Sequence, residues 1–189
     1  MPTYVAFLRA INVGGRFVKM AVLAQHFRDL GHADAQTYLN SGNVVFRTES
    51  RSPVALASAI EQGLSPRLGF ETHAFVRSAT QVHGIAQRGM ALASDRSLAD
   101  VNVAFLAAPL AEPQVAVLQT LRSAVDAFVV DGTEVYWTCR VRQSESAFSN
   151  NVFERKVKER TTLRRAVMLH GLSQQLRADG GLAETMRAP

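Results

Sequence analysis

Cysteine, long apolar runs and aromatic residues are scarce in this sequence of 189 residues, and each scarcity removes a class of protein. A single cysteine, Cys139, cannot form a disulfide within the chain, which excludes a small disulfide scaffold. No apolar run approaches the ~18 residues that a membrane span requires, and the start of the chain has no signal-peptide pattern. The 47% hydrophobic and 20% charged residues are typical of a globular protein. We therefore expect a soluble, cytoplasmic protein without a membrane partner.

The net charge of +5 comes from the last quarter of the chain. Residues 140–189 hold 10 basic and 5 acidic side chains, whereas residues 1–139 hold 11 of each. A solvated helix face and a nucleic-acid-binding surface both account for such an excess. With 7% aromatic residues and no RNP1-type aromatic run, the usual stacking mode of RNA binding is not favoured. The basic residues that such a surface would use are Arg155, Lys156, Arg160, Arg164 and Arg165.

The first half of the chain reads as β-α-β-β-α-β. Apolar side chains at successive positions predict a first strand buried on both faces. Ser52 followed by Pro53 predicts a helix start, and Gly31 and Gly69 predict helix ends. The predicted elements are a strand at 4–11, a helix at 20–30, strands at 37–39 and 43–46, a helix from 53 that ends by 69, and a strand at 70–76.

The second half repeats this order in part, after a polar segment at 94–100. Its apolar pattern and turn signals predict a strand at 101–106, a helix at 113–124 and a hairpin of strands 128–130 and 135–137. Two helices follow, one with Val152, Phe153 and Val157 and a last one with Leu163, Val167, Leu172 and Leu176. No clear final strand is predicted. We therefore expect an α+β fold of two tandem ferredoxin-like (α-β plait) subdomains, residues 1–93 and 94–189, each an antiparallel sheet with helices.

Three segments of the first half stand out as motifs: Phe7-Leu8-Arg9-Ala10-Ile11-Asn12-Val13-Gly14-Gly15, Lys19-Met20, and Tyr38-Leu39-Asn40-Ser41-Gly42-Asn43-Val44-Val45-Phe46. Together they resemble the bacterial family called domain of unknown function 1697. The resemblance implies two α-β plait subdomains and no established activity. Towards its C-terminus the family typically shows Thr-Arg-Asn-Trp, where this chain has Thr161-Thr162-Leu163-Arg164-Arg165, so no role is carried over to these positions.

Two loops are expected to converge at one edge of the first sheet. In a sheet of spatial order 4-1-3-2, the first two strands run in the same direction, which puts residues 12–15 and 40–43 at one edge, on the order of 10 Å apart. The helix that begins near Lys19 directs unpaired amides and its positive dipole end there, which favours an anion. We predict a site for a phosphate or carboxylate formed by Arg9, Asn12, Gly14, Gly15, Lys19, Asn40, Ser41, Gly42 and Asn43.

A purely structural interpretation of the same residues stays open. The glycine pair can serve a tight turn, the asparagines can cap the hairpin, and Arg9 can bind backbone carbonyls. The corresponding loop of the second half, residues 107–112, has no glycine and adds a negative charge. The composition of the first loop is therefore not a requirement of the architecture alone.

Signals of catalysis are missing. The five histidines lack metal-ligand spacing, and neither paired carboxylates nor a nucleophile motif appears. The polar loop Gln143-Ser144-Glu145-Ser146 has ordinary loop composition. We predict no catalytic residue, metal or cofactor. Three functions stay open: non-catalytic binding of a phosphorylated or anionic small molecule at the edge of the first subdomain, nucleic-acid binding through the basic C-terminal region, and an unrecognised transferase or hydrolase using the same edge. The sequence decides neither whether the protein is an enzyme nor its oligomeric state.

Overall fold

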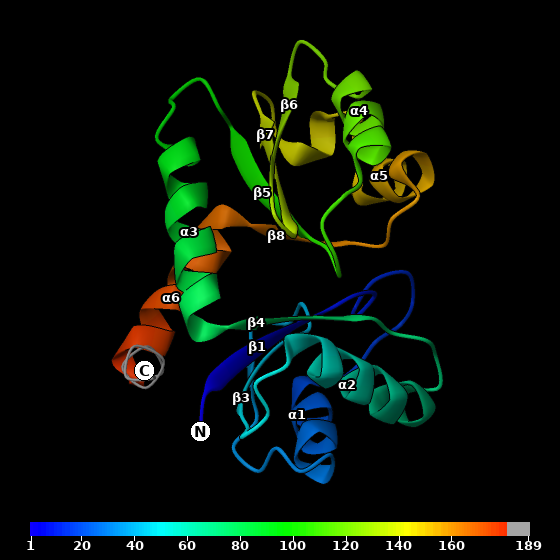
Figure 1. Ribbon diagram of the computed structural model, residues 1–189, viewed down its shortest axis with the longest axis vertical. Coiled ribbons are helices and arrows are strands. Elements are labelled where there is room, and N and C mark those ends of the chain that lie inside the picture. Colours follow the sequence, from blue (N-terminus) through cyan, green and yellow to red (C-terminus); the bar gives the residue numbers. More distant parts are fainter. Residues whose placement is uncertain (181–189) are drawn as a thin grey trace. The chain divides into compact units, whose positions relative to one another are not determined.

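The computed structural model describes residues 1–180 and divides the chain into two compact units (Figure 1). Among the described residues, unit 1 consists of Met1–Val82 together with residues 172–180, and unit 2 is His83–Gly171. The expected boundary after residue 93 lies at the end of a helix, eleven positions beyond this division. The last nine residues of the expected segment 94–189 fall outside the described residues.

The first half contains the β-α-β-β-α-β order predicted from the sequence. Its elements are β1 (Thr3–Leu8), α1 (Met20–Asp29), β2 (Gln36–Tyr38), β3 (Asn43–Arg47), α2 (Pro53–Leu68) and β4 (Ala74–Ser78). The antiparallel sheet has the order β2-β3-β1-β4, which is the expected 4-1-3-2. All six residues of β1 are buried, as its apolar run predicts for a central strand.

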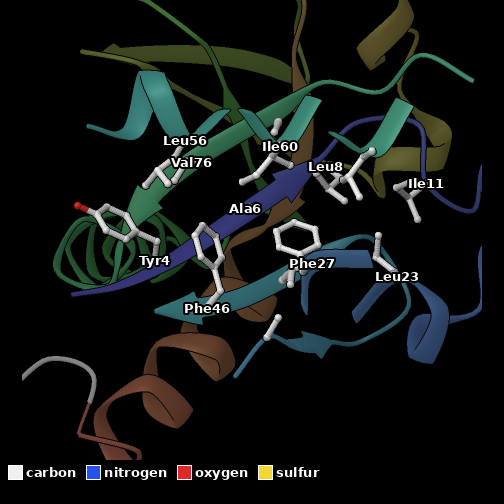
Figure 2. Close-up of a cluster of buried hydrophobic side chains, with 14 residues drawn as sticks. Tyr4, Ala6, Leu8, Ile11, Leu23, Phe27, Phe46, Leu56, Ile60 and Val76 are labelled. Atoms are coloured by element: carbon white, nitrogen blue, oxygen red, sulfur yellow. The ribbon is translucent and has the colours of Figure 1, made fainter. Parts of the chain in front are cut away.

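The core of unit 1 lies between one face of this sheet and the two helices (Figure 2). Alternate residues of β1, including Ala6 and Leu8, point towards Leu23 of α1 and Ile60 of α2. The local signals for α2 are confirmed: the Ser52 hydroxyl accepts a hydrogen bond from the Ala55 amide at 3.2 Å. Gly69 ends the helix in the left-handed conformation at φ 74°.

The second half repeats the same order. Its elements are β5 (Asp100–Phe105), α4 (Glu112–Thr120), β6 (Asp126–Asp131), β7 (Glu134–Cys139), a 3-10 turn at Gln143–Glu145, α5 (Asn150–Val157), β8 (Thr162–Arg165) and α6 (Ala166–Ala178). Its sheet is antiparallel with the order β6-β7-β5-β8. The expectation of an α+β fold of two tandem plaits is therefore confirmed.

Two elements of the structure are absent from the sequence prediction. A final strand, β8, does exist, and it contains Leu163, which we had expected in the last helix. The pairing of β8 with β5 explains the difference, because a partner strand defines so short an element. The helix α3 (Ala79–Ala93) follows β4 directly and was not expected at all.

Candidate functional site

The two predicted loops are in direct contact at one edge of the first sheet. Both β1 and β2 pair antiparallel with β3, so these two strands end on the same side. The Asn12 side chain donates a hydrogen bond from Nδ2 to the carbonyl oxygen of Asn40 at 2.8 Å. The amide of Leu8 donates to the carbonyl of Gly42, also at 2.8 Å. The loops are therefore closer than two strand spacings alone would place them.

Gly42 makes this close approach possible. Its φ of 71° is left-handed, and an added Cβ would lie 2.9 Å from Cβ of Ile11 and 3.2 Å from Cβ of Leu8. Contacts shorter than 3.0 Å force neighbouring atoms to move, and both neighbours are buried. Gly42 therefore acts as the point at which the hairpin packs against the end of β1.

The predicted asparagines hold the loops in shape. Asn12 has a left-handed φ of 58°, and its Oδ1 accepts a hydrogen bond from the Val18 amide at 2.8 Å. Asn43 is fully buried, and its Nδ2 donates to the Tyr38 carbonyl at 2.9 Å and to the Ser41 hydroxyl at 3.0 Å. These side chains bind protein groups, as the structural interpretation describes, and they frame the edge.

An exposed backbone surface lies beside this frame. Gly14 and Gly15 are exposed with φ of 59° and 82°, and a Cβ added at either would meet no atom within 4 Å. Lys19 occupies the N-cap of α1 without a side-chain cap, and no acidic residue lies in the first turn. Within residues 1–180, the amides of Met20, Ala21 and Val22 have no hydrogen-bond acceptor. The N-terminus of α1 is thus electrostatically open to an anion.

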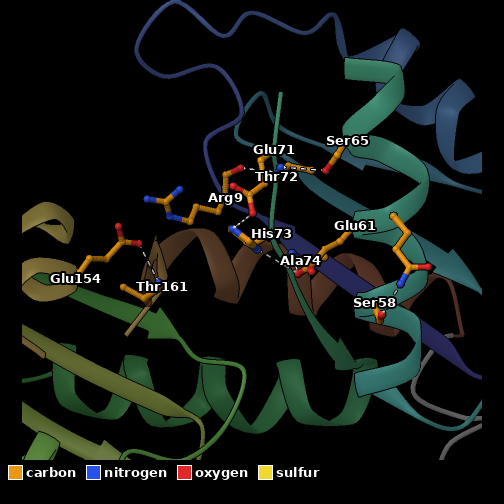
Figure 3. A network of polar contacts seen from close by, with 11 residues as sticks. Arg9, Ser58, Glu61, Ser65, Glu71, Thr72, His73, Ala74, Glu154 and Thr161 are labelled. Atoms are coloured by element: carbon orange, nitrogen blue, oxygen red, sulfur yellow. Dashed lines mark hydrogen bonds and ion pairs between the residues drawn. The ribbon is translucent and has the colours of Figure 1, made fainter. Parts of the chain in front are cut away.

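Arg9, Arg16 and Lys19 are the cationic residues of this edge, and the structure shows contacts that position the first two. The backbone of Arg9 is fixed by the Thr72 hydroxyl, which donates to the Arg9 carbonyl at 2.8 Å, and by the His73 carbonyl, which accepts from the Arg9 amide at 2.8 Å (Figure 3). The guanidinium of Arg16 lies over the Phe70 ring, 5.2 Å from its centroid. Residues 9–19 contain these two arginines and Lys19 but no acidic residue, so the loop is purely cationic.

Exposed apolar side chains at the same edge were missed by sequence reasoning. Phe17 is 82% exposed, Val13 is 59% exposed and Leu39 is 57% exposed. All three lie in the two loops that meet at Asn12 and Asn40. The available signal was the presence of large apolar residues in a loop that fits neither helical nor strand periodicity.

The basic residues of the C-terminal region do not form one exposed surface. Arg155 and Lys156 are exposed in the last turn of α5, and Arg160 is exposed beyond it. Arg165 binds the Asp100 carboxylate. Arg164, in contrast, is 7% exposed and donates to the Thr162 hydroxyl and the Leu163 carbonyl, both at 2.8 Å. Burial lowers the pKa of the Arg164 guanidinium to about 10.

The first half has a buried arginine at the equivalent position. Arg77 in β4 lies opposite Val5 of the central strand β1, as Arg164 in β8 lies opposite Val103 of the central strand β5. Each arginine donates from Nη1 to the carbonyl of the residue before it. The repeated arrangement indicates that Arg164 serves the fold of its sheet.

Two classes of site are not found in the described part of the chain. Among residues 1–180, no group of three or more His, Cys, Asp or Glu side chains could hold a metal ion. No helix in the same residues is long and apolar enough to cross a membrane.

The two plaits and the loop edge define an α+β protein with tandem ferredoxin-like halves. The chain belongs to the family described as Protein of unknown function (DUF1697), whose model matches residues 1–136. Its fold is similar to that of the conserved bacterial protein SP0830 from Streptococcus pneumoniae, with a TM-score of 0.65 and 22% sequence identity. That similarity covers 94% of this chain and 99% of the other. No curated protein matches the sequence.

Proposed function

We propose that this protein binds a phosphorylated or otherwise anionic small molecule at the edge formed by residues 9–19 and 39–43, without transforming it. The observation that carries the proposal is the open N-terminus of α1, where Lys19 supplies no side-chain cap and the amides of Met20, Ala21 and Val22 have no acceptor in the part of the chain that the structure describes. Backbone N–H groups and the helix dipole together favour a negative group at such a position.

The surrounding loop supports an anion in two further ways. Residues 9–19 contain three cations and no acidic residue, a composition that favours a negatively charged ligand. Gly14 and Gly15 have no side chains and open space around them, so a ligand can approach the backbone closely. Phe17, at 82% exposure, offers an aromatic face to the apolar or ring-shaped part of the same molecule.

We propose that this binding takes place in the bacterial cytoplasm. Cys139 is a free thiol buried in unit 2, and the cytoplasm is the compartment that keeps thiols reduced.

The experiment is a titration of the full chain with inorganic phosphate and a panel of nucleotides and sugar phosphates, followed by thermal shift and calorimetry. A charge-assisted hydrogen bond contributes about 1.5–3 kcal/mol, so we expect Lys19→Ala to weaken the best ligand by roughly 10- to 150-fold. Arg9→Ala and Gly14→Val should weaken it as well. Native mass spectrometry of freshly isolated protein would identify a ligand that copurifies.

Arg51→Ala is the matched control. Arg51 is also an exposed cation before a helix of unit 1, but that helix is capped by the Ser52 hydroxyl. The control should bind as the unmodified protein does. Equal loss in Arg51→Ala and Lys19→Ala, or no thermal shift with any member of the panel, would contradict the proposed site.

A further inference from the structure

We propose a second ligand site, located within unit 2, that binds a phosphate monoester with a hydroxyl-bearing body, such as a sugar phosphate. It is a cavity of about 780 Å³ where β5 begins, β8 ends and the loop from β7 to α5 passes. The residues that matter for binding are Asp100, Arg142, Gln143, Ser144, Ser149 and Arg165. All of its lining residues belong to unit 2, and none belongs to the loop edge of unit 1.

The wall of this cavity is fixed by hydrogen bonds within the loop. The amide of Gln143 donates to Oδ2 of Asp100 at 2.8 Å. The amide of Arg142 donates to the Glu145 carboxylate at 3.2 Å. The Ser146 hydroxyl donates to Asp126 at 2.8 Å and accepts from the Phe148 amide at 2.9 Å. These hydrogen bonds order the loop before a ligand binds, so binding costs the loop little conformational entropy.

The charges that line the cavity favour an anion. Two arginines face one carboxylate, that of Asp100, and both of its oxygens already accept hydrogen bonds, from Arg165 and from the Gln143 amide. The exposed guanidinium of Arg142 pairs with no carboxylate among residues 1–180. Arg142 therefore has free donors for a ligand, while Arg165 is positioned by Asp100 and keeps 62% of its side chain exposed.

The start of α5 adds backbone donors beside this pair of arginines. Ser149, which lines the cavity, caps the helix by accepting from the Val152 amide at 3.3 Å. The amides of Asn150 and Asn151 have no acceptor in the described part of the chain, and the first turn contains no acidic residue. These groups add to the cationic wall and favour a dianion over a singly charged carboxylate.

The remaining lining indicates what the ligand carries besides phosphate. A volume of about 780 Å³ is in the usual range for small-molecule sites and exceeds the needs of an isolated phosphate ion. The Ser144 hydroxyl and the Gln143 side chain can exchange hydrogen bonds with hydroxyl groups. A phosphorylated polyol satisfies both the cationic and the neutral polar parts of the cavity.

The test is an amide-resolved NMR titration of the full chain with glucose 6-phosphate, inorganic phosphate and glucose. We expect glucose 6-phosphate to change the amide chemical shifts of Ser144, Ser149 and Asn150. Its affinity should be higher than that of inorganic phosphate and much higher than that of uncharged glucose. Arg142→Ala should weaken this binding on the order of tenfold. Arg142→Lys should retain part of the affinity for glucose 6-phosphate. Arg155 is an exposed arginine on α5 outside the cavity, so Arg155→Ala should leave the affinity unchanged.

The outcomes separate this site from the one in unit 1. Shifts confined to Met20 and Ala21, insensitive to Arg142→Ala, would overturn the second site and leave the first. Shifts confined to Ser144, Ser149 and Asn150 would support the second site and count against the first. If inorganic phosphate binds as tightly as glucose 6-phosphate, or if Arg142→Ala has no effect while its melting curve is unchanged, an adventitious ion only is bound and the proposal is wrong.

Discussion

Replacing Gly42 by alanine tests whether the two loops of unit 1 meet as closely as the structure shows. The substitution adds one methyl group at a position with φ 71°, 2.9 Å from Cβ of Ile11 and 3.2 Å from Cβ of Leu8. Two independent penalties follow. The left-handed backbone costs an alanine about 1–2 kcal/mol, and overpacking in a tight site adds about 1–3 kcal/mol. We therefore expect Gly42→Ala to lower the free energy of unfolding by about 2–5 kcal/mol.

Gly14→Ala supplies the reference for the backbone penalty alone. Gly14 also has a left-handed φ, 59°, but an added Cβ would meet nothing within 4 Å. We expect this variant to lose only about 1–2 kcal/mol. The difference between the two variants, about 1–3 kcal/mol, measures the contact of Gly42 with Ile11 and Leu8.

Urea unfolding followed by far-UV circular dichroism gives both free energies under the same conditions. The reasoning would be refuted if the two variants were destabilised equally, because the extra methyl group of Gly42→Ala would then meet open space. A Gly42→Ala protein that folds but loses anion binding would further show that the hairpin contact positions the site.

Three further predictions concern unit 2. Arg164→Glu should cost about 3–5 kcal/mol of stability in urea unfolding because it puts an unpaired carboxylate in a buried position, whereas exposed Arg155→Glu should change it by less than about 0.5 kcal/mol. Burial opposes the Asp126 charge, but hydrogen bonds from Trp137, Ser146 and Ser123 outweigh it and hold the pKa of that carboxyl below 3.8. The stabilisation from this carboxylate is therefore complete above pH 3.8 and is lost as the pH falls through the lower folded-state pKa. In Asp126→Asn, the folding stability followed by Trp137 fluorescence should therefore decrease less steeply with falling pH. Burial raises the pKa of the Cys139 thiol, so it should react with a thiol reagent near pH ~8 only after unfolding; rapid labelling of the native protein would contradict its burial.

Local signals in the sequence were sufficient for most of the fold. Ser52, Pro53 and Gly69 define the ends of α2 by their own conformational preferences, and the structure shows the cap and the left-handed glycine that these preferences predict. The unbroken apolar run of β1 similarly predicts a central strand, because such a strand has no solvent-facing side. The order 4-1-3-2 then follows from the alternation of elements.

Other elements depend on contacts that lie far away in the sequence. Arg164 and Arg165 make β8 look like a polar surface segment, and only pairing with Asn102 and Val103 of β5 makes it a strand. For α3 a local signal was present but overlooked. Ser78 and Gln81 form a capping box, in which the Gln81 amide donates to the Ser78 hydroxyl at 3.2 Å and Gln81 accepts from the Ser78 amide at 2.9 Å.

The candidate site shows the same division between local and distant information. Topology alone was enough to predict that residues 12–15 and 40–43 lie at one edge. The bonds from Asn12 to Val18 and to the Asn40 carbonyl could not be foreseen, because side-chain partners depend on how the two loops pack. The exposure of Phe17 likewise depends on packing, since an aromatic residue in a loop is as easily buried as exposed.

Unit 1 is built from two stretches of chain that the whole of unit 2 separates, and this affects how the first plait can be isolated. A fragment ending at residue 93 would omit the buried Leu172 and Leu176 of α6. Leu176 and Asp179 line a cavity of about 430 Å³ together with Thr3, so the beginning of the chain and the end of α6 adjoin. A circular permutant that joins α6 directly to β1 would therefore keep the unit intact, whereas simple truncation would uncover apolar surface and invite aggregation.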